Sequence, residues 1–482
     1  MKTKRPSKVE AAILTLEPPK CRAAWLEEPE LEFGGGNQHP NPKIGIPLYG
    51  PWTLGTSRHK SEAHIGFIGS AEVAEAAQEF FVRAAEGIAN EGNQFSFPGS
   101  KADRGFRCEL RFDTRMIEPI TRAEMKEIDD IKSGRERFER LMKSIDSKLD
   151  LLSRRDHPLD YIIFALPESL YSRCRSVEYV EKKVGKVHRD LRRAFKAMAM
   201  RYFKPTQVFR ETTTKAGPQS RDLDHPSKIA WNLFTGLYFK VDGLPWAPVG
   251  LPAGSCFIGV SFYRPLGSTS TLRTSVVQAF DEHGEGLVLR GHDFHWDEKR
   301  HGKSPHLPSD LAHELVKMVL DRYQEERRQL PQRVVLHKTS RYEDAELDGF
   351  ESALSRVHQY DLVALAPVSD VRLARAGKYP PMRGTFFEIG DEAYLYSTGF
   401  MPDMGGYPHG HVPSPLRITD HVGDTPLTQI TREVLILTKM NWNSANGFGL
   451  MPITLRFSRL VGDVLREVPE GQVPQPKYKF YI

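Results

Sequence analysis

Hydrophobic positions in the first half of the chain change between short continuous runs and helical spacing. Ala63–Ser70 and Asp160–Leu166 are short apolar runs, which are typical of strands buried inside a parallel sheet. Glu72–Asn90 and Thr121–Arg155 instead repeat their apolar residues at the spacing of one helix face. Gln207–Phe209 gives a further strand signal. Strands that alternate with helices predict an α/β domain built on a parallel sheet.

The second half of the chain begins with consecutive strands and continues with alternating helices and strands. The predicted strands are Cys256–Phe262, Thr274–Phe280 and Gly286–Arg290, followed by a helix at Ser309–Arg328, a strand at Arg333–His337, a helix at Tyr342–Val357 and a strand at Tyr360–Ala366. Three antiparallel strands followed by alternating helix and strand is the order of a ribonuclease H-like fold. A loop rich in Gly, Pro and His, Met401–Pro415, precedes the last helices.

The start of the chain has little periodic pattern. Gly34–Gly36 and His39–Pro42 are rich in turn residues, so we expect an irregular segment that leads into the first domain. A chain of 482 residues is too long for one ordinary core. We therefore predict an N-terminal segment over residues 1–60, a first domain over 61–245 and a second domain over 246–482.

A basic segment follows the second predicted strand of the first domain. We predict a helix over Glu178–Met200, and its cations are Lys182, Lys183, Lys186, Arg189, Arg192, Arg193 and Lys196. A solvated helix surface would explain a charged face, but such surfaces usually mix the two signs more evenly. Contact with phosphate groups is the alternative, and the pattern alone leaves both open.

Composition narrows the class of protein without naming its function. Apolar residues make up 39% and charged residues 27% of the chain, as in soluble globular proteins, and the net charge of +5 is only a weak pointer to nucleic acid. The four cysteines form no Cys-x-x-Cys pair, which argues against a zinc site and a disulfide framework. Neither a charged-then-apolar leader nor an apolar run of ~20 residues is present. We expect a cytoplasmic protein that does not enter a membrane.

Several segments together resemble one known family. They are Leu31–Gly36, Pro42–Pro51 (PKIGIPLYGP), Asp160–Pro167, Pro205–Glu211 (PTQVFRE), Trp231–Trp246 (WNLFTGLYFKVDGLPW), Leu437–Asn443 (LTKMNWN), Pro452–Leu465 (PITLRFSRLVGDVL) and Lys477–Ile482 (KYKFYI). In this order they resemble short prokaryotic Argonautes, which lack the N and PAZ domains of long Argonautes. The resemblance covers most of the chain and implies a Rossmann-like MID domain followed by a ribonuclease H-like PIWI domain.

The resemblance also implies a pocket for the 5′ phosphate of a guide strand. Arg192 and Lys196 stand four residues apart, Gln207 lies on the following strand, and Lys240 lies further on, with Lys228 as a competing candidate for the last position. Two cations at this spacing present donors side by side to phosphate oxygens.

A metal at this pocket is a further implication of the resemblance. In some relatives the C-terminal carboxylate helps to hold a divalent metal on the guide phosphate. Ile482 would supply that carboxylate here, Gln207 would be the second ligand, and Mg²⁺ suits such oxygen ligands. The alternative is that the aromatic residues near Ile482 only pack an apolar tail.

The positions that resemble the catalytic metal ligands of PIWI domains do not hold acids. They are Ser261, Thr339 and Arg459, and two-metal phosphodiester cleavage needs carboxylates there. We therefore expect no catalytic residues and no slicing. His292, His295, His301 and His306 lack a regular ligand spacing, so we interpret them as exposed loop histidines.

Taken together, the resemblance implies a guide-dependent sensor that does not cut its target. The guide would be RNA and the target complementary single-stranded DNA. The response would come from a separate APAZ-domain effector protein, with a sirtuin-like effector favoured and a TIR or nuclease effector also considered. Such a sensor would act in prokaryotic immunity as a heterodimer that can assemble further when activated. A target-cleaving nuclease and a guide-independent scaffold remain the alternatives.

Overall fold

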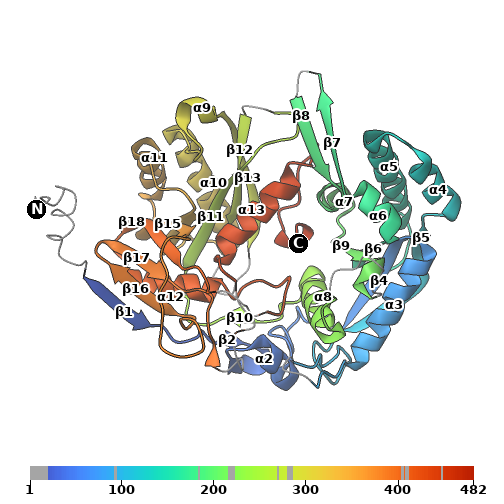
Figure 1. Ribbon diagram of the computed structural model, residues 1–482, viewed down its shortest axis with the longest axis horizontal. Coiled ribbons are helices and arrows are strands. Elements are labelled where there is room, and N and C mark those ends of the chain that lie inside the picture. The colour runs from blue at the N-terminus through green and yellow to red at the C-terminus, as the bar shows by residue number, and fades with distance from the viewer. Residues whose placement is uncertain are drawn as a thin grey trace, which may run out of the picture.

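The structure is a computed structural model that describes residues 20–91, 95–182, 185–214, 223–268, 271–278, 286–402, 407, 412–446, 449–469 and 471–482. Two lobes lie side by side, and each is built around its own large sheet (Figure 1). The first lobe contains a four-stranded sheet and the second a nine-stranded sheet. This mixed α/β architecture is the predicted fold class.

The four-stranded sheet is parallel throughout. Its order is β5 (Glu109–Pro119), β4 (Glu62–Gly69), β6 (Tyr161–Leu166) and β9 (Thr206–Arg210). Alternate residues of β6 face opposite sides, one packing with α3 (Ala71–Glu86) and the other with α5 (Gly134–Ser153) and α7 (Leu191–Ala199). Every residue of β6 is buried for this reason, which explains its continuous apolar run. The Rossmann-like prediction for this domain is confirmed.

The nine-stranded sheet contains the predicted ribonuclease H-like core. Antiparallel strands β11 (Ser255–Tyr263), β12 (Thr271–Gln278) and β13 (Leu287–His295) are joined by β14 (Arg333–Lys338) and β15 (Gln359–Pro367), which run parallel to β11. Helices α10 (Ser309–Arg327) and α11 (Asp344–Leu354) pack against one face. Helix α13 (Ile453–Leu465) crosses the other so closely that a Cβ at Gly259 would lie 2.1 Å from the Thr454 carbonyl oxygen.

Four further strands extend this sheet beyond what the sequence pattern predicts. They are β18 (Leu416–Gly423), β17 (Glu392–Leu395), β16 (Thr385–Ile389) and, at the edge, β1 (Cys21–Trp25). The start of the chain therefore pairs with the second lobe, whereas its pattern predicts an irregular lead into the first. All five residues of β1 are exposed, so no alternation of buried and exposed positions marks the strand.

Two helix predictions are wrong in their extent. The segment Thr121–Arg155 forms two helices, α4 (Arg122–Asp130) and α5, because the Ser133 side chain caps a new helix start by accepting from the Glu136 N–H. The predicted basic helix Glu178–Met200 is instead a hairpin followed by a short helix.

The hairpin consists of β7 (Ser176–Glu181) and β8 (Gly185–Asp190), and α7 follows at once. Its valines favour strand over helix, and Gly185 adopts a positive φ of 84° at the turn. Lys182, Lys186 and Arg189 therefore lie on the hairpin, while Lys183 falls outside the described residues. Much of Met401–Pro415 also falls outside them.

The two lobes share one continuous core. A single cluster of buried side chains includes residues of β4 and α3 in the first lobe and of β14 and α13 in the second. At the rim of this junction, the Arg189 guanidinium lies 2.9 Å from the buried Glu467 carboxylate, and Arg193 pairs with Asp463 at 2.9 Å. Within the described part of the chain, no helix is long and apolar enough to cross a membrane.

Candidate anion-binding site

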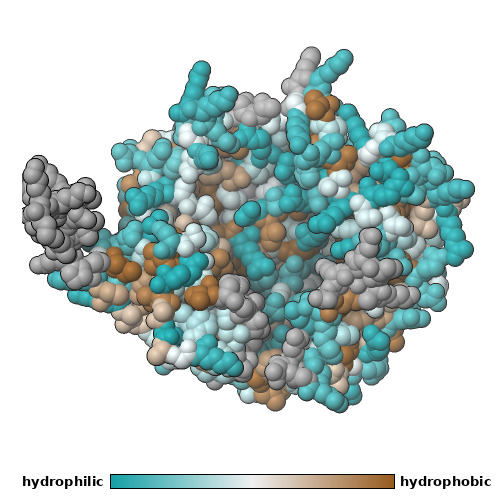
Figure 2. Space-filling view, viewed as in Figure 1, coloured by the Kyte–Doolittle hydropathy of each residue, from teal (hydrophilic) through white to brown (hydrophobic). Residues whose placement is uncertain are grey.

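Helix α7 and the end of the chain meet between the two lobes. Asp190 caps α7 by accepting from the Arg193 N–H, which sets the first turn so that Arg192 and Lys196 follow on one side. The C-terminus lies near the middle of the face drawn in Figure 1. Figure 2 shows this face as largely hydrophilic around a central hollow where apolar residues gather.

Two buried lysines converge on one carbonyl oxygen at this junction. Lys196 Nζ and Lys240 Nζ each donate to the Thr206 carbonyl oxygen, both at 3.1 Å. Lys240 Nζ also donates to Gln207 Oε1 at 2.7 Å, and Lys196 Nζ donates to the main-chain oxygen of Ile482. The side chains of Lys196 and Lys240 are 2% and 0% exposed, so these ammonium groups are withdrawn from water.

Burial and the neighbouring positive charges lower the pKa values of the cations in this cluster. Burial lowers the pKa of Lys196 well below its ordinary value, and the nearby charges of Lys240 and Arg192 lower it further. Burial and the Arg192 charge lower the pKa of Lys240 in the same way. Burial also lowers the pKa of Arg192, which the neighbouring Asp190 partly offsets. The face of the Tyr161 ring, 5.6 Å from Lys240 Nζ, gives a weak compensating attraction.

Apart from the terminal oxygen of Ile482, which Lys196 contacts, no acidic group neutralises these two lysines in the described part of the chain. Among the residues that the structure describes, no carboxylate side chain forms an ion pair with Lys196 or Lys240. Burying a cation without a counter-charge is costly, so proteins usually pair such groups or use them to hold an anion. The cluster can therefore accept an anion with several oxygens, such as a phosphate.

The structure brings together the predicted phosphate-binding residues. Arg192 and Lys196 come from α7, Gln207 from β9 and Lys240 from the end of α8 (Pro226–Lys240), and Ile482 also lies at the cluster. The competing candidate Lys228 lies elsewhere, in an ion pair with Asp224 at 2.7 Å.

The sequence pattern did not predict two groups of the cluster, the Thr206 carbonyl oxygen and the Tyr161 ring. The Thr206 carbonyl oxygen is a main-chain group, for which the sequence carries no signal. Tyr161 begins the apolar run of β6, so its pattern predicts only a core residue. The packing of β6 beside β9, which places Tyr161 near Lys240, could be inferred only from the sheet order.

The positions Ser261, Thr339 and Arg459 lie around one end of the ribonuclease H-like core. Ser261 is on β11 with a buried hydroxyl that has no hydrogen-bond partner in the described part of the chain, and Thr339 follows β14 directly. Arg459 is exposed on α13. Within the described ranges, no group of three or more His, Cys, Asp or Glu side chains is arranged to hold a metal ion.

The four histidines do not form one loop cluster. His292 and His295 belong to β13, which is longer than predicted, and His301 ends the short helix α9 (Glu298–His301). His306 lies 3.3 Å from the Glu346 carboxylate through Nδ1.

Comparison with known proteins adds to this geometry. No family model matches the chain. The protein argonaute of Thermus thermophilus is 27% identical over 167 residues, which are 33% of this chain and 23% of that protein. The structure of Clostridium butyricum Argonaute bound to a guide DNA and a 19-mer target DNA superposes with a TM-score of 0.66 at 15% identity, covering 96% of this chain.

A second solved Argonaute structure also superposes on most of this chain. The structure of A. aeolicus Argonaute superposes with a TM-score of 0.56 at 16% identity over 94% of this chain. The fold is Argonaute-like. This chain spans about half of the solved Argonautes, 55% and 54% of their lengths. The Argonaute-like fold thus covers both lobes, the one with the parallel four-stranded sheet and the one with the nine-stranded sheet.

Proposed function

We propose that this protein holds the 5′ phosphate of a guide strand in the cluster of Arg192, Lys196, Gln207 and Lys240, and senses a complementary target without cutting it. The guide would be RNA and the target single-stranded DNA. The observation that carries the proposal is the pair of buried lysines without a carboxylate side chain as partner among the described residues. An Argonaute-like fold supports the choice of a nucleic acid as the source of the phosphate.

A terminal phosphate would reverse the unfavourable charge balance of this cluster. Such a group carries nearly two negative charges, and bringing it beside the lysines raises their pKa again because it favours the ammonium form. Lys196 and Lys240 would act as point charges, while the Arg192 guanidinium would donate two parallel hydrogen bonds. Gln207 Nε2 now donates to the Val208 carbonyl oxygen at 3.2 Å and would supply a neutral donor.

We include Mg²⁺ at the guide phosphate in the proposal. Gln207 Oε1 and the Ile482 oxygen both lie at the cluster, where lysine ammonium groups now donate to them. They fit a magnesium ion as oxygen ligands, with water and phosphate oxygens completing the set. The ion would add positive charge beside the phosphate. Guide affinity measured with and without a chelator tests this part, since an unchanged affinity removes the metal from the proposal.

We also propose that the PIWI-like domain does not slice. Neither hydroxyl at Ser261 and Thr339 replaces a carboxylate well, and the cationic Arg459 would repel a metal ion. The test is to incubate the guide-loaded protein with labelled complementary DNA and Mg²⁺ or Mn²⁺. Intact target is the expected result, and a guide-positioned cleavage product would favour the nuclease alternative.

The response to target pairing would come from a separate chain. We propose an APAZ-domain partner, with a sirtuin-like NAD-hydrolysing effector favoured over a TIR or nuclease effector, acting in the cytoplasm against invading DNA. The support is the resemblance of several segments to short Argonautes. Co-expression with a candidate partner and measurement of NAD consumption, with and without guide and target, tests this step.

The decisive experiment compares binding of a short RNA with and without a 5′ phosphate. The wild type should prefer the phosphorylated RNA by roughly 10-fold to 100-fold, because a hydrogen bond to a charged group contributes about 1.5–3 kcal/mol. Lys196→Ala should lose this preference. Lys228→Ala is the matched control, because Lys228 lies in an exposed ion pair, and it should keep the preference.

Equal binding of both RNAs by the wild type would overturn the proposal. It would favour a guide-independent scaffold instead, and such a protein would also keep its partner when both Arg192 and Lys196 are changed to Glu.

A further inference from the structure

The buried hydroxyl of Tyr478 lies near the proposed guide-phosphate cluster and has no partner. Tyr478 begins the short helix η5 (Tyr478–Phe480) and is 2% exposed. Its ring stacks on Phe457 of α13, with the two ring planes 15° apart. Its hydroxyl makes no hydrogen bond among the residues that the structure describes. A buried hydroxyl without a partner is costly, so proteins commonly satisfy such a group with water or a ligand.

Two arginines are the charged groups that act on this hydroxyl. Burial raises the pKa of the Tyr478 phenol well above its ordinary value, and the positive charges of Arg456 and Arg192 partly offset that rise. Both guanidinium groups therefore lie close enough to influence the phenol oxygen. The phenol stays protonated, so it can donate a hydrogen bond to an incoming acceptor.

Neither arginine is held by an acidic side chain. Among the described residues, Arg192 and Arg456 form no ion pair and no hydrogen bond. The acid of α13 that lies closest to α7, Asp463, is 2.9 Å from Arg193 instead. Guanidinium groups and a hydroxyl are donors that suit phosphate oxygens. This corner of the junction can therefore accept an anion of its own.

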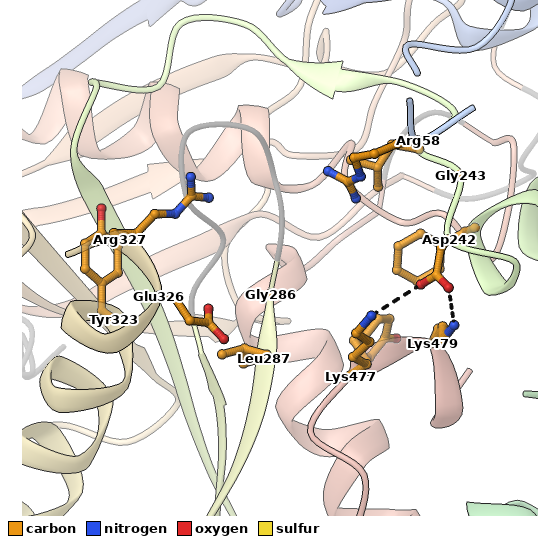
Figure 3. A pocket seen from close by; sticks show the side chains of 13 residues that line it. Arg58, Asp242, Gly243, Gly286, Leu287, Tyr323, Glu326, Arg327, Lys477 and Lys479 are labelled. Carbon is orange, nitrogen blue, oxygen red and sulfur yellow. Dashed lines mark hydrogen bonds and ion pairs between the residues drawn. The ribbon is translucent and has the colours of Figure 1, made fainter. Parts of the chain in front are cut away.

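The turn that carries Tyr478 is held in place by its neighbours in the chain. Lys477 and Lys479 both lie near the Asp242 carboxylate, with N–O distances of 3.7 and 2.6 Å. Figure 3 shows these two ion pairs at an adjoining cavity. Both lysines are thus already paired, so the positive charge that acts on the Tyr478 hydroxyl comes from the two arginines.

Exposure increases from the lysines of the cluster to the arginine of α13. Lys196 and Lys240 are buried, Arg192 is half-buried, and Arg456 is exposed on the first turn of α13. A strand that enters from solvent would place its terminal phosphate deepest, beside the lysines. Its next phosphate would lie further out, where Tyr478 and Arg456 are. The charges match this order, because a terminal phosphate carries nearly two negative charges and a phosphodiester carries only one.

We propose that Tyr478 and Arg456 bind the phosphodiester that follows the first nucleotide, and that this contact selects a strand over a free mononucleotide. The inference rests on the proposed function, since it takes the terminal phosphate to lie beside Lys196 and Lys240. A mononucleotide leaves the Tyr478 hydroxyl without an acceptor, whereas a strand supplies one. Sites built to hydrogen-bond a group discriminate strongly against ligands that lack it.

The test compares ligands that share the same terminal phosphate and first nucleoside. They are uridine 5′-monophosphate, the dinucleotide pUpU and a pUpU analogue with a neutral methylphosphonate linkage. Each competes with labelled 5′-phosphorylated RNA for the full-length protein. The pUpU dinucleotide should bind roughly 10-fold to 100-fold more tightly than its methylphosphonate analogue, because a hydrogen bond to a charged group is lost in the analogue. The analogue also controls for contacts of the second base.

Two variants and one control assign this preference to residues. Tyr478→Phe removes only the hydroxyl and keeps the ring that packs on Phe457, so the preference for pUpU over the analogue should fall by roughly 10-fold. Arg456→Met should reduce it too. Neither variant should change the affinity for uridine 5′-monophosphate, which also shows that the cluster is still folded. Lys317→Met, which changes an exposed lysine on α10, should leave all three affinities unchanged.

Three outcomes would overturn the inference. One is equal affinity of the wild type for pUpU and its analogue, and another is an unchanged preference in both variants. The third is loss of mononucleotide binding in both variants, which would assign these residues to the terminal phosphate. The proposed function fails by a different result, namely equal binding of RNA with and without a 5′ phosphate.

Discussion

Buried cations in the two lobes have opposite surroundings. In the nine-stranded lobe, the buried Arg333 lies 2.7 Å from both the Asp361 and the Glu433 carboxylates, and Lys338 pairs with the buried Glu346. In the four-stranded lobe, Lys196 and Lys240 are equally buried but have no carboxylate side chain beside them among the described residues. They contact the Thr206 carbonyl oxygen, the Gln207 amide oxygen and, for Lys196, the terminal oxygen of Ile482.

The presence or absence of a carboxylate side chain distinguishes buried cations that stabilise the fold from buried cations that can bind an anionic ligand. A buried ion pair has its counter-charge built into the fold, so removing one partner leaves the other charge stranded. A buried cation without a carboxylate makes the ligand-free protein less stable, and an incoming anion can recover that free energy. Substitutions of the same kind should therefore change stability in opposite directions in the two lobes.

The largest expected effect is in the paired set. Arg333→Met leaves Asp361 and Glu433 buried without their cation and should lower the free energy of unfolding by about 3–5 kcal/mol. Denaturant unfolding of the RNA-free protein measures this. A loss below about 1 kcal/mol would show that the three charges do not act as a structural unit.

The second effect has the opposite sign. Lys240→Met removes an unfavourably buried charge and keeps a similar volume, so the RNA-free variant should unfold at equal or greater free energy, by up to about 2 kcal/mol. The same denaturant series measures it beside Arg333→Met. A destabilisation as large as that of Arg333→Met would make Lys240 a structural residue and remove the contrast.

A smaller effect concerns the neutral member of the cluster. Gln207→Met removes one uncharged hydrogen-bonding group, so the affinity for 5′-phosphorylated RNA should fall by about 1 kcal/mol, or roughly fivefold. Affinity for RNA without the phosphate should not change. A fall of the same size for both RNAs would mean that Gln207 positions the strand rather than its phosphate.

The smallest effect is a pH dependence in the paired lobe. Burial, with a contribution from Arg333, lowers the pKa of His337 from 6.5 to about 3. Below about pH 6.5, His337 therefore binds a proton in the unfolded chain but stays neutral in the folded protein. As a result, the free energy of unfolding falls as the pH drops toward 3. Between pH 7 and 6 the loss should stay below about 1 kcal/mol. His337→Gln should flatten this part of the stability curve, and an unchanged slope would contradict it.

Elements with a strong period were predictable, and those shaped by tertiary contacts were not. The apolar run of β6 predicted its place inside a parallel sheet, because burial on both faces leaves that pattern. The hairpin β7–β8 was predicted as a helix because its cations also occur at helical intervals, although its valines favour strand. The cap at Ser133 that divides α4 from α5 was also missed.

The grouping of the candidate site came from the resemblance to short Argonautes, because the charge pattern alone left a solvated surface and phosphate contact both open. Arg192 and Lys196 lie one helical turn apart in the sequence and on the same helix in the structure. What could not be predicted is their burial. Only the packing of α7 against β9 and the chain end shows that Lys196 is withdrawn from water, and that property separates a ligand site from a solvated surface.

The edge position of β1 has a consequence for how the protein is made. Trp25 donates to the Arg383 carbonyl oxygen at 2.9 Å, and these residues stand 358 positions apart in the chain. Ribosomes add about 5–20 residues per second, so Cys21–Trp25 waits roughly 20 to 70 s before its partner strand β16 exists. The short length of β1 limits the unpaired backbone exposed to other chains during that interval. One of the first strands to be synthesised is thus among the last to pair. The sheet of the second lobe stays incomplete until β16 has been synthesised and β1 has paired with it.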